Sequence, residues 1–252
     1  MPETPNTADR MLAILVLVAT LATVGVNALA ALGLVNGVSP AMISERHPSF
    51  ITPAGYAFSI WGLIYLWMLA FGIYQLAPAN IKRFKDIRTL YIASCVLNCT
   101  SIWFWHHEQV AVCLLFIVGL TTTLFGIVWR LRQPVQLVDA LLTKAPFGIY
   151  FGWVTCAMLV NLNILFSGSG TSDKVLYLLG VVSILLAAAS GALACWKLNN
   201  FLYPLAVAWA LTAIAVKQSG QTALVVAAAF GTVLCLVAAG SVVTRLKDST
   251  SE

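Results

Sequence analysis

Charged residues divide this chain into long apolar runs. Eight stretches of nineteen or more residues contain no Asp, Glu, Lys or Arg: 11–44, 47–81, 89–107, 109–129, 145–172, 175–196, 198–216 and 218–244. A helix needs about 20 apolar residues to cross roughly 30 Å of hydrocarbon at 1.5 Å per residue. The pattern therefore predicts one membrane-crossing helix in each run, and an all-α, polytopic membrane bundle of about eight transmembrane helices.

The apolar runs also indicate which kind of membrane fold to expect. Segments such as 11–35 and 175–195 are apolar on every side, which is typical of a helix that has lipid on one face and protein on the other. A membrane β-barrel would instead show segments of about 10 residues that alternate between apolar and polar. That alternation is absent, so the helical bundle is favoured.

The composition of the chain excludes one class of function, that of a water-soluble enzyme. The chain is 60% hydrophobic and 9% charged, with a mean hydropathy of +0.91, whereas soluble domains are about 25% charged. The loops between the apolar runs are too short for an extramembrane domain. A water-soluble catalyst with a peripheral anchor is excluded, and any chemistry must lie within the helices or at their ends.

Lysine and arginine are distributed unevenly over the predicted loops. If the amino terminus is cytoplasmic, three basic residues fall outside, namely Arg46, Lys174 and Lys217, and the other eleven fall inside. Basic residues accumulate on the cytoplasmic side. We therefore expect both termini to be cytoplasmic, in a protein of a bacterial inner membrane, and the basic residues within 82–88 to contact anionic lipid headgroups. Nucleic acid is not an expected partner, because no basic stripe continues onto a folded domain.

The first apolar run allows a second interpretation. Arg10 followed by an apolar stretch that ends in Ala28-Leu29-Ala30 resembles a cleavable secretory signal. The stretch continues to about Val35, which is longer than a signal core and favours an uncleaved helix. Cleavage would leave seven spans and an outside amino terminus.

Residue types divide the chain into two parts. Six of the eight tryptophans lie in the first five spans, whereas the last three spans are dominated by small residues, as in Ala187–Gly191 and Ala227–Gly231. Small residues allow membrane helices to approach closely. We expect 1–167 to form a five-helix ligand-binding bundle and 168–252 to add three helices that serve as a packing module.

Polar groups within the predicted spans are few. No charged residue lies there, which argues against an ion-driven pump. The amides Asn27, Asn98, Asn161 and Asn163 either join helices or contact a ligand. The six cysteines all fall in spans, where packing is favoured over metal binding. No nucleophile elbow, phosphate-binding loop or zinc-protease motif is present, so we expect neither an enzyme nor a metal site.

Two helical faces are rich in aromatic residues. The first face holds Phe58, Trp61, Tyr65 and Met68, and the second holds Tyr150, Trp153, Ala157, Asn161 and Ile164. On each face, successive residues are three or four positions apart, as on one side of a helix. Together these faces would suit a flat apolar ligand that carries a few polar groups. The alternative is that they only form core or an interfacial belt.

The segment from Glu45 to Tyr65 resembles the tryptophan-rich sensory protein family, also called the translocator protein or TspO/MBR family. His47-Pro48-Ser49-Phe50 takes the place of the family's loop motif and Pro53-Ala54-Gly55-Tyr56 that of its turn. Trp61 and Tyr65 keep the family's four-residue separation. Weaker similarities are Leu97-Asn98 with Trp103, and Trp153 with Asn161. The resemblance covers about residues 11–167.

This resemblance implies a five-helix bundle that binds porphyrins, haem-type tetrapyrroles, sterols or synthetic aromatic ligands beneath a loop. Here the loop, which we call the lid, is residues 36–54. The implied ligand-binding residues are Pro53, Tyr56, Trp61, Tyr65, Asn98, Trp103, Trp153 and Asn161. A haem would also need an axial ligand, for which His106 or His107 are candidates, unless both lie in a solvated turn. We expect no resident cofactor, because a porphyrin or haem would be a ligand. Membrane lipids are the other expected partners.

Three functions follow from these features. The first is a membrane sensor or binding protein for a hydrophobic aromatic ligand such as a porphyrin or a sterol-like lipid, with the lid as its gate. The second is a facilitative permease for a small amphipathic solute, and the third is a ligand-free membrane scaffold.

Overall fold

The computed structural model describes residues 6–133, 135 and 137–248, and all elements within them are helices. In chain order they are α1 (Thr7–Ala31), α2 (Pro40–Arg46), the short 3-10 helix η1 (Gly55–Ser59), α3 (Ile60–Tyr74), α4 (Pro78–Arg83), α5 (Lys85–His106), α6 (Val110–Arg130), α7 (Leu137–Ser167), α8 (Asp173–Leu198), α9 (Leu202–Lys217) and α10 (Thr222–Asp248). The prediction of an all-α polytopic membrane bundle is confirmed.

Seven segments in the described part of the chain are long and apolar enough to cross a membrane: α1, η1 with α3, α5, α6, α7, α8 and α10. The predicted span 198–216 corresponds to α9, which has 16 residues and is shorter than the other seven. At 1.5 Å per residue it is about 24 Å long. Most of its side chains are buried, so α9 is covered mainly by neighbouring helices.

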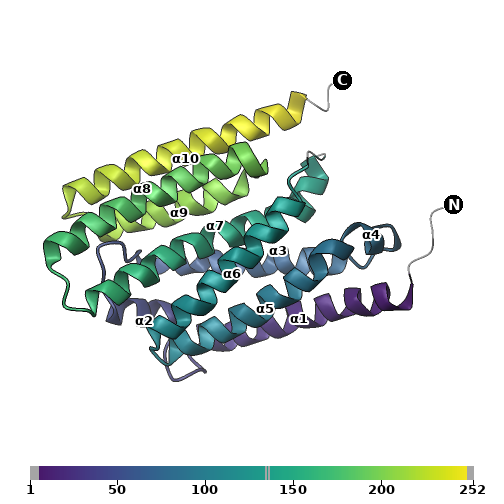
Figure 1. Ribbon diagram of the computed structural model, residues 1–252, viewed down its shortest axis with the longest axis horizontal. Helices are drawn as coiled ribbons and strands as arrows, with labels where there is room; N and C mark the ends of the chain where they lie inside the picture. Colours follow the sequence, from purple (N-terminus) through teal and green to yellow (C-terminus); the bar gives the residue numbers. More distant parts are fainter. Residues whose placement is uncertain (1–5, 134, 136, 249–252) are drawn as a thin grey trace.

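The helices pack as two groups that share α7 (Figure 1). α8, α9 and α10 lie side by side, while α1 and α5 lie on the opposite side of the bundle. Between them, α7 contacts α3, α6, α8 and α9. One hydrophobic cluster runs through both groups, from Val16 on α1 to Cys235 on α10. The start of α1 and the end of α10 lie at the same end of the bundle, and α2 lies at the other.

Two glycines on α7 allow α9 to approach its backbone. A Cβ atom on Gly152 would lie 2.5 Å from the carbonyl oxygen of Tyr203, and one on Gly148 would overlap the amide of Asn200. Oδ1 of Asn200 also accepts hydrogen bonds from the backbone N–H groups of the first two residues of α9, Leu202 and Tyr203, at 3.1 Å each, which stabilises the start of the helix. The small-residue spacing on α7 thus fixes where α9 packs.

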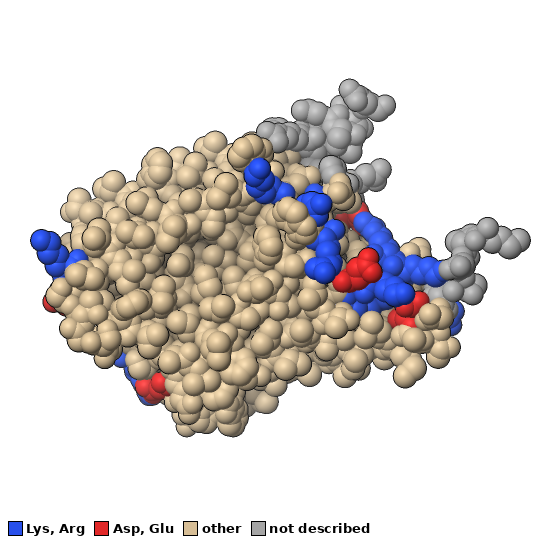
Figure 2. All heavy atoms as spheres, in the orientation of Figure 1, with Lys and Arg blue, Asp and Glu red and all other residues tan. Residues whose placement is uncertain are grey.

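Charged side chains gather at the end of the molecule that carries the termini (Figure 2). There Arg83 pairs with Asp139, donating from Nη1 at 2.8 Å, and the hydrogen bond to Asp139 raises the pKa of Arg83. The expectation that the basic residues of 82–88 contact headgroups is wrong for Arg88. Its side chain is 1% exposed, and its Nε donates to Oε1 of Gln75 at 2.9 Å inside the bundle.

Candidate ligand-binding cavity

A cavity of about 90 Å³ lies between the lid and the helices α3, α5, α6, α7 and α9. It is lined by Pro40, Ser44, Pro53, Phe58, Trp61, Asn98, Ser101, Ile102, Trp105, Cys113, Ile117, Leu120, Trp153, Val154, Cys156, Ala157, Val160, Asn161, Ala210 and Ile214. The lining is mostly apolar, with a few amide, hydroxyl and indole groups. An apolar cavity with few polar groups is the usual form of a small-molecule site.

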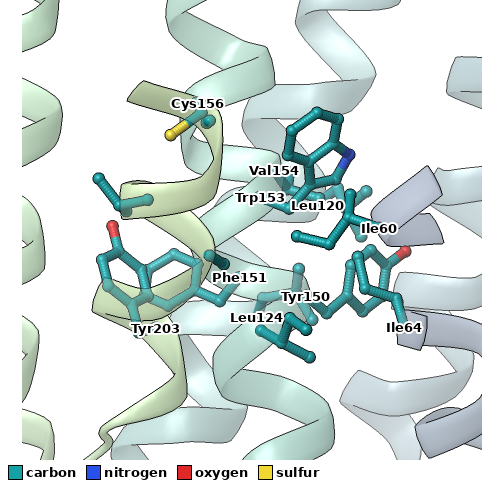
Figure 3. Packing of buried hydrophobic residues seen from close by; sticks show 14 of the residues in the cluster. Ile60, Ile64, Leu120, Leu124, Tyr150, Phe151, Trp153, Val154, Cys156 and Tyr203 are labelled. Carbon is teal, nitrogen blue, oxygen red and sulfur yellow. The ribbon is translucent and has the colours of Figure 1, made fainter. Parts of the chain in front are cut away.

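Aromatic rings from α3 and α7 meet at the cavity. The ring centroids of Trp61 and Trp153 lie 6.3 Å apart with the planes at 88°, and Phe58 packs edge-on against Trp153 at 5.9 Å. Edge-to-face pairs at such distances are favourable. Figure 3 shows Trp153 and Tyr150 on the side of α7 that faces Ile60 of α3. The aromatic residues of the second and fifth spans therefore contact each other around a shared cavity.

The two predicted amides both line the cavity but differ in their hydrogen bonding. Oδ1 of Asn98 accepts a hydrogen bond from Nδ2 of Asn27 on α1 at 2.6 Å, so Asn98 also joins α5 to α1. Nδ2 of Asn161 donates to the backbone oxygen of Ala157 at 2.9 Å, whereas its Oδ1 is buried without a partner among the described residues. Asn161 therefore keeps one acceptor that no described residue satisfies.

Five of the predicted ligand-binding residues line the cavity: Pro53, Trp61, Asn98, Trp153 and Asn161.

The other three predicted residues, Tyr56, Tyr65 and Trp103, are placed elsewhere. Tyr65 stacks on Trp61 with ring centroids 5.4 Å apart, which places it next to the lining. Tyr56 is 46% exposed and packs edge-on against Trp209. Trp103 is 55% exposed and is absent from the lining.

The lining contains a tryptophan that the sequence analysis missed. Trp105 is 7% exposed and lines the cavity in place of Trp103. Along α5, the lining residues Asn98, Ser101, Ile102 and Trp105 recur at spacings of three, four and seven, which is one helical face. Five residues after Asn98, Trp103 falls on a different face. Helical periodicity counted from Asn98 was the signal that could have identified Trp105.

One wall of the cavity comes from α9, in the part of the chain that we expected to serve only in packing. Ala210 and Ile214 lie four residues apart and line the cavity together. The sequence carries no motif there, because small and branched apolar residues are common in all three of the last spans. The proximity follows from the close approach of α9 to α7 at Gly152.

The lid is held on one side by the turn between α5 and α6. Nη1 of Arg46 donates to Oε1 of Glu108 at 2.8 Å, and Nε2 of His47 lies 3.0 Å from Oε2 of the same carboxylate. Hydrogen bonding from Arg46 lowers the pKa of Glu108. Further in, Nε1 of Trp105 donates to the carbonyl oxygen of Pro40 at 3.2 Å. These contacts hold α2 over the cavity.

The other side of the lid is held by α8 and α9. The backbone N–H of Ala54 donates to the carbonyl oxygen of Ala213 at 3.0 Å, and Nε2 of Gln218 donates to the carbonyl oxygen of Ser49 at 3.1 Å. Phe50 packs edge-on against Tyr177 of α8 at 5.3 Å. The lid is thus held between both groups of helices.

Neither candidate histidine belongs to the cavity lining. His106 is buried, with Nδ1 3.0 Å from the carbonyl oxygen of Val35. His107 is exposed and stacks on Trp103. The lining as described therefore offers no imidazole to a haem iron. The described residues also contain no group of three or more His, Cys, Asp or Glu that could hold a metal ion.

The fold and the cavity define the class: a polytopic helical membrane protein with a cavity lined partly by aromatic residues beneath a loop. A family model described as "TSPO-like protein" matches residues 13–242, almost the whole chain. The chain therefore belongs to the TSPO-like (TspO/MBR) family, and the match extends from α1 into α10. No curated protein and no solved structure matches it.

Proposed function

We propose that this protein binds an uncharged aromatic small molecule within the membrane, as a sensor or carrier, with the lid as its gate. The main support is the cavity in which Trp61 and Trp153 meet at right angles beneath the lid. Membership of the TSPO-like family agrees with a membrane ligand-binding or transport-related role. Indole and phenyl rings around a mostly apolar cavity favour a flat apolar guest.

The size of the cavity bears on which aromatic ligand it holds. Its volume is about 90 Å³, and an engineered protein cavity of about 150 Å³ admits benzene. The cavity is therefore smaller than one that admits a single ring, and a ligand of one or two rings requires side chains of the lining to move. A tetrapyrrole or a sterol is several times larger and requires the lid to move away from α7 and α9.

The lid contacts support the gating part of the proposal. The ion pair between Arg46 and Glu108 is weak, because both groups are exposed and solvent screens their interaction. The hydrogen bonds from Ala54 and Gln218 are also few. Opening the lid also exposes Val38, Ile43 and Ile51, which are buried in the hydrophobic cluster, so we propose that α9 and the α5–α6 turn control it together with this apolar packing.

The two-part division of the chain enters this proposal in a modified form. Residues 1–167 supply most of the cavity wall, and within 168–252 α9 adds Ala210 and Ile214. We propose that α8 and α10 act mainly in packing, by holding α9 against α7. The ligand-binding unit then consists of the first five membrane-crossing helices and α9.

A calorimetric titration of the protein in lipid nanodiscs tests the proposal. Naphthalene derivatives serve as small probes and a porphyrin as the large one, with empty nanodiscs as the blank for partitioning. Trp61→Phe is expected to weaken binding by at most about 12-fold, because an aromatic pair contributes about 0.5–1.5 kcal/mol and phenylalanine keeps a smaller ring. Trp196→Phe is the matched control, since Trp196 is 70% exposed on α8 and the same change there leaves affinity unaltered.

The outcomes separate the candidate functions. If no probe binds, the proposal is contradicted and a ligand-free membrane scaffold is the remaining candidate function. Equal effects of Trp61→Phe and Trp196→Phe show that the probe binds outside the cavity. If the porphyrin binds and the naphthalenes do not, the ligand is the large one and it binds with the lid open. Counterflow of a bound probe in proteoliposomes distinguishes a carrier from a sensor.

A further inference from the structure

Two polar atoms in the cavity wall are buried and have no hydrogen-bond partner among the described residues. They are Nε1 of Trp153, whose side chain is 4% exposed, and Oδ1 of Asn161, which is 5% exposed. Buried polar atoms in proteins are nearly always hydrogen-bonded. Both residues line the cavity, so a guest that supplies the complementary groups would satisfy a donor and an acceptor that the described residues leave unpaired.

The two atoms belong to one face of α7. Trp153, Ala157 and Asn161 follow each other at intervals of four residues and all line the cavity. The outer two are eight residues apart, which is about 12 Å along a helix axis. The methyl group of Ala157 leaves room between them. A guest that reaches both side chains therefore carries its two polar groups apart from each other.

The charge of the guest is also constrained. The lining residues include no Asp, Glu, Lys, Arg or His, and burying an unpaired charge in such surroundings is very costly. The lid adds one more polar atom, because Oγ of Ser44 is buried in the lining without a partner among the described residues. The guest is therefore neutral and contacts the lid as well as α7.

We propose that the ligand is an uncharged, elongated aromatic molecule of about two rings. At one end it carries an acceptor for the indole N–H of Trp153, and at the other a donor for the amide oxygen of Asn161. This inference rests on the proposed function and specifies its ligand class. A hydroxynaphthalene with an acetyl group at the far end of the ring system has this arrangement.

Three naphthalenes of nearly equal shape form the test, each titrated calorimetrically into the protein in nanodiscs. The first carries the hydroxyl and acetyl groups, the second has methoxy in place of hydroxyl, and the third has carboxylate in place of acetyl. Loss of the donor leaves Oδ1 of Asn161 unpaired, so the methoxy compound is expected to bind about 5- to 100-fold more weakly. The carboxylate is expected to bind more weakly still.

Two substitutions assign the preference to its residues. In Asn161→Leu the hydroxy and methoxy compounds are expected to bind equally. Asn163→Leu is the matched control, because Asn163 bonds to Ser183 of α8 and is absent from the lining, and it keeps the preference. Trp153→Phe retains the ring but removes the N–H, and it is expected to abolish the benefit of the acetyl group relative to unsubstituted hydroxynaphthalene. Size-exclusion profiles confirm that each variant is folded.

Failure of this inference is distinguishable from failure of the proposed function. If the hydroxy and methoxy compounds bind the unaltered protein equally, the donor–acceptor requirement is wrong although an aromatic site exists. A preference that survives in Asn161→Leu also overturns the assignment. If none of the naphthalenes binds, both the inference and the proposed function are refuted.

Discussion

The contact between α7 and α9 at Gly152 offers a test that depends on backbone geometry. A Cβ atom on Gly152 would lie 2.5 Å from the carbonyl oxygen of Tyr203 and 3.0 Å from Cβ of Ala206. Favourable contacts between heavy atoms lie at about 3.5–4.0 Å. In Gly152→Ala the two helices must therefore separate locally by about 1 Å, which changes both the packing and the cavity wall next to Trp153.

The expected cost follows from a matched comparison. Overpacking costs about 1–3 kcal/mol, while replacing a helical glycine by alanine contributes about 0.8–1.0 kcal/mol in favour of the helix. Gly62→Ala, on α3, gains the same propensity and meets no atom within 4 Å. The difference in free energy of unfolding between Gly152→Ala and Gly62→Ala is therefore about 1–3 kcal/mol, with Gly152→Ala less stable.

Sodium dodecyl sulfate titration in mixed micelles, followed by circular dichroism, measures this difference. The same preparations serve for calorimetric titration with the hydroxy-acetylnaphthalene, where Gly152→Ala is expected to bind more weakly and Gly62→Ala as well as the unaltered protein. Equal unfolding midpoints for the two variants would refute the close approach of α7 and α9, and with it the placement of α9 in the cavity wall.

Three further predictions concern the lid and α9. Hydrogen bonds from Arg46 and His47 lower the pKa of Glu108 below its ordinary value of 4.5. The ionised carboxylate therefore stabilises the closed lid above pH 4.5, and this stabilisation is lost as the pH falls through the lowered pKa. Ligand entry measured by stopped flow should accelerate over that acidic range, and Glu108→Gln should show no such acceleration. Gln218→Leu removes the hydrogen bond to the lid backbone and should speed ligand entry and release together, whereas a change in release alone would contradict a gating role. Asn200→Ala removes the hydrogen bonds of this side chain to the first turn of α9 and to the carbonyl oxygen of Lys144 and should lower the free energy of unfolding by about 1–2 kcal/mol in the same detergent titration, an unchanged value showing that these hydrogen bonds are dispensable.

The positions of the membrane-crossing helices could be predicted from the sequence, because the hydrocarbon thickness fixes a minimum apolar length. The weakest case was 198–216, where α9 occupies only Leu202–Lys217. Apolar composition does not report whether lipid or protein covers a helix. The burial of α9 depends on its contact with Gly152, and a single sequence does not show which helix packs there.

The candidate site could be predicted in part, and the differences have a common cause. Trp61 and Trp153 reach the cavity because each lies on a face with clear helical periodicity. Trp103 was chosen by its similarity to a family motif, although the periodicity from Asn98 favours Trp105. Ala210 of α9 was missed because a small apolar residue has no chemical signature, and only the tertiary arrangement places it in a cavity wall.

The shortness and burial of α9 also have a consequence for biosynthesis. A helix that protein must cover on most sides gains little by entering lipid alone, so α9 is expected to remain near the insertion machinery until α10 emerges and the two leave as a pair. α8 would insert before them, since its side chains include many that face outward, such as Leu178, Leu186 and Trp196. The cavity wall that α9 supplies is consequently completed last, after the first five membrane-crossing helices are already in the bilayer.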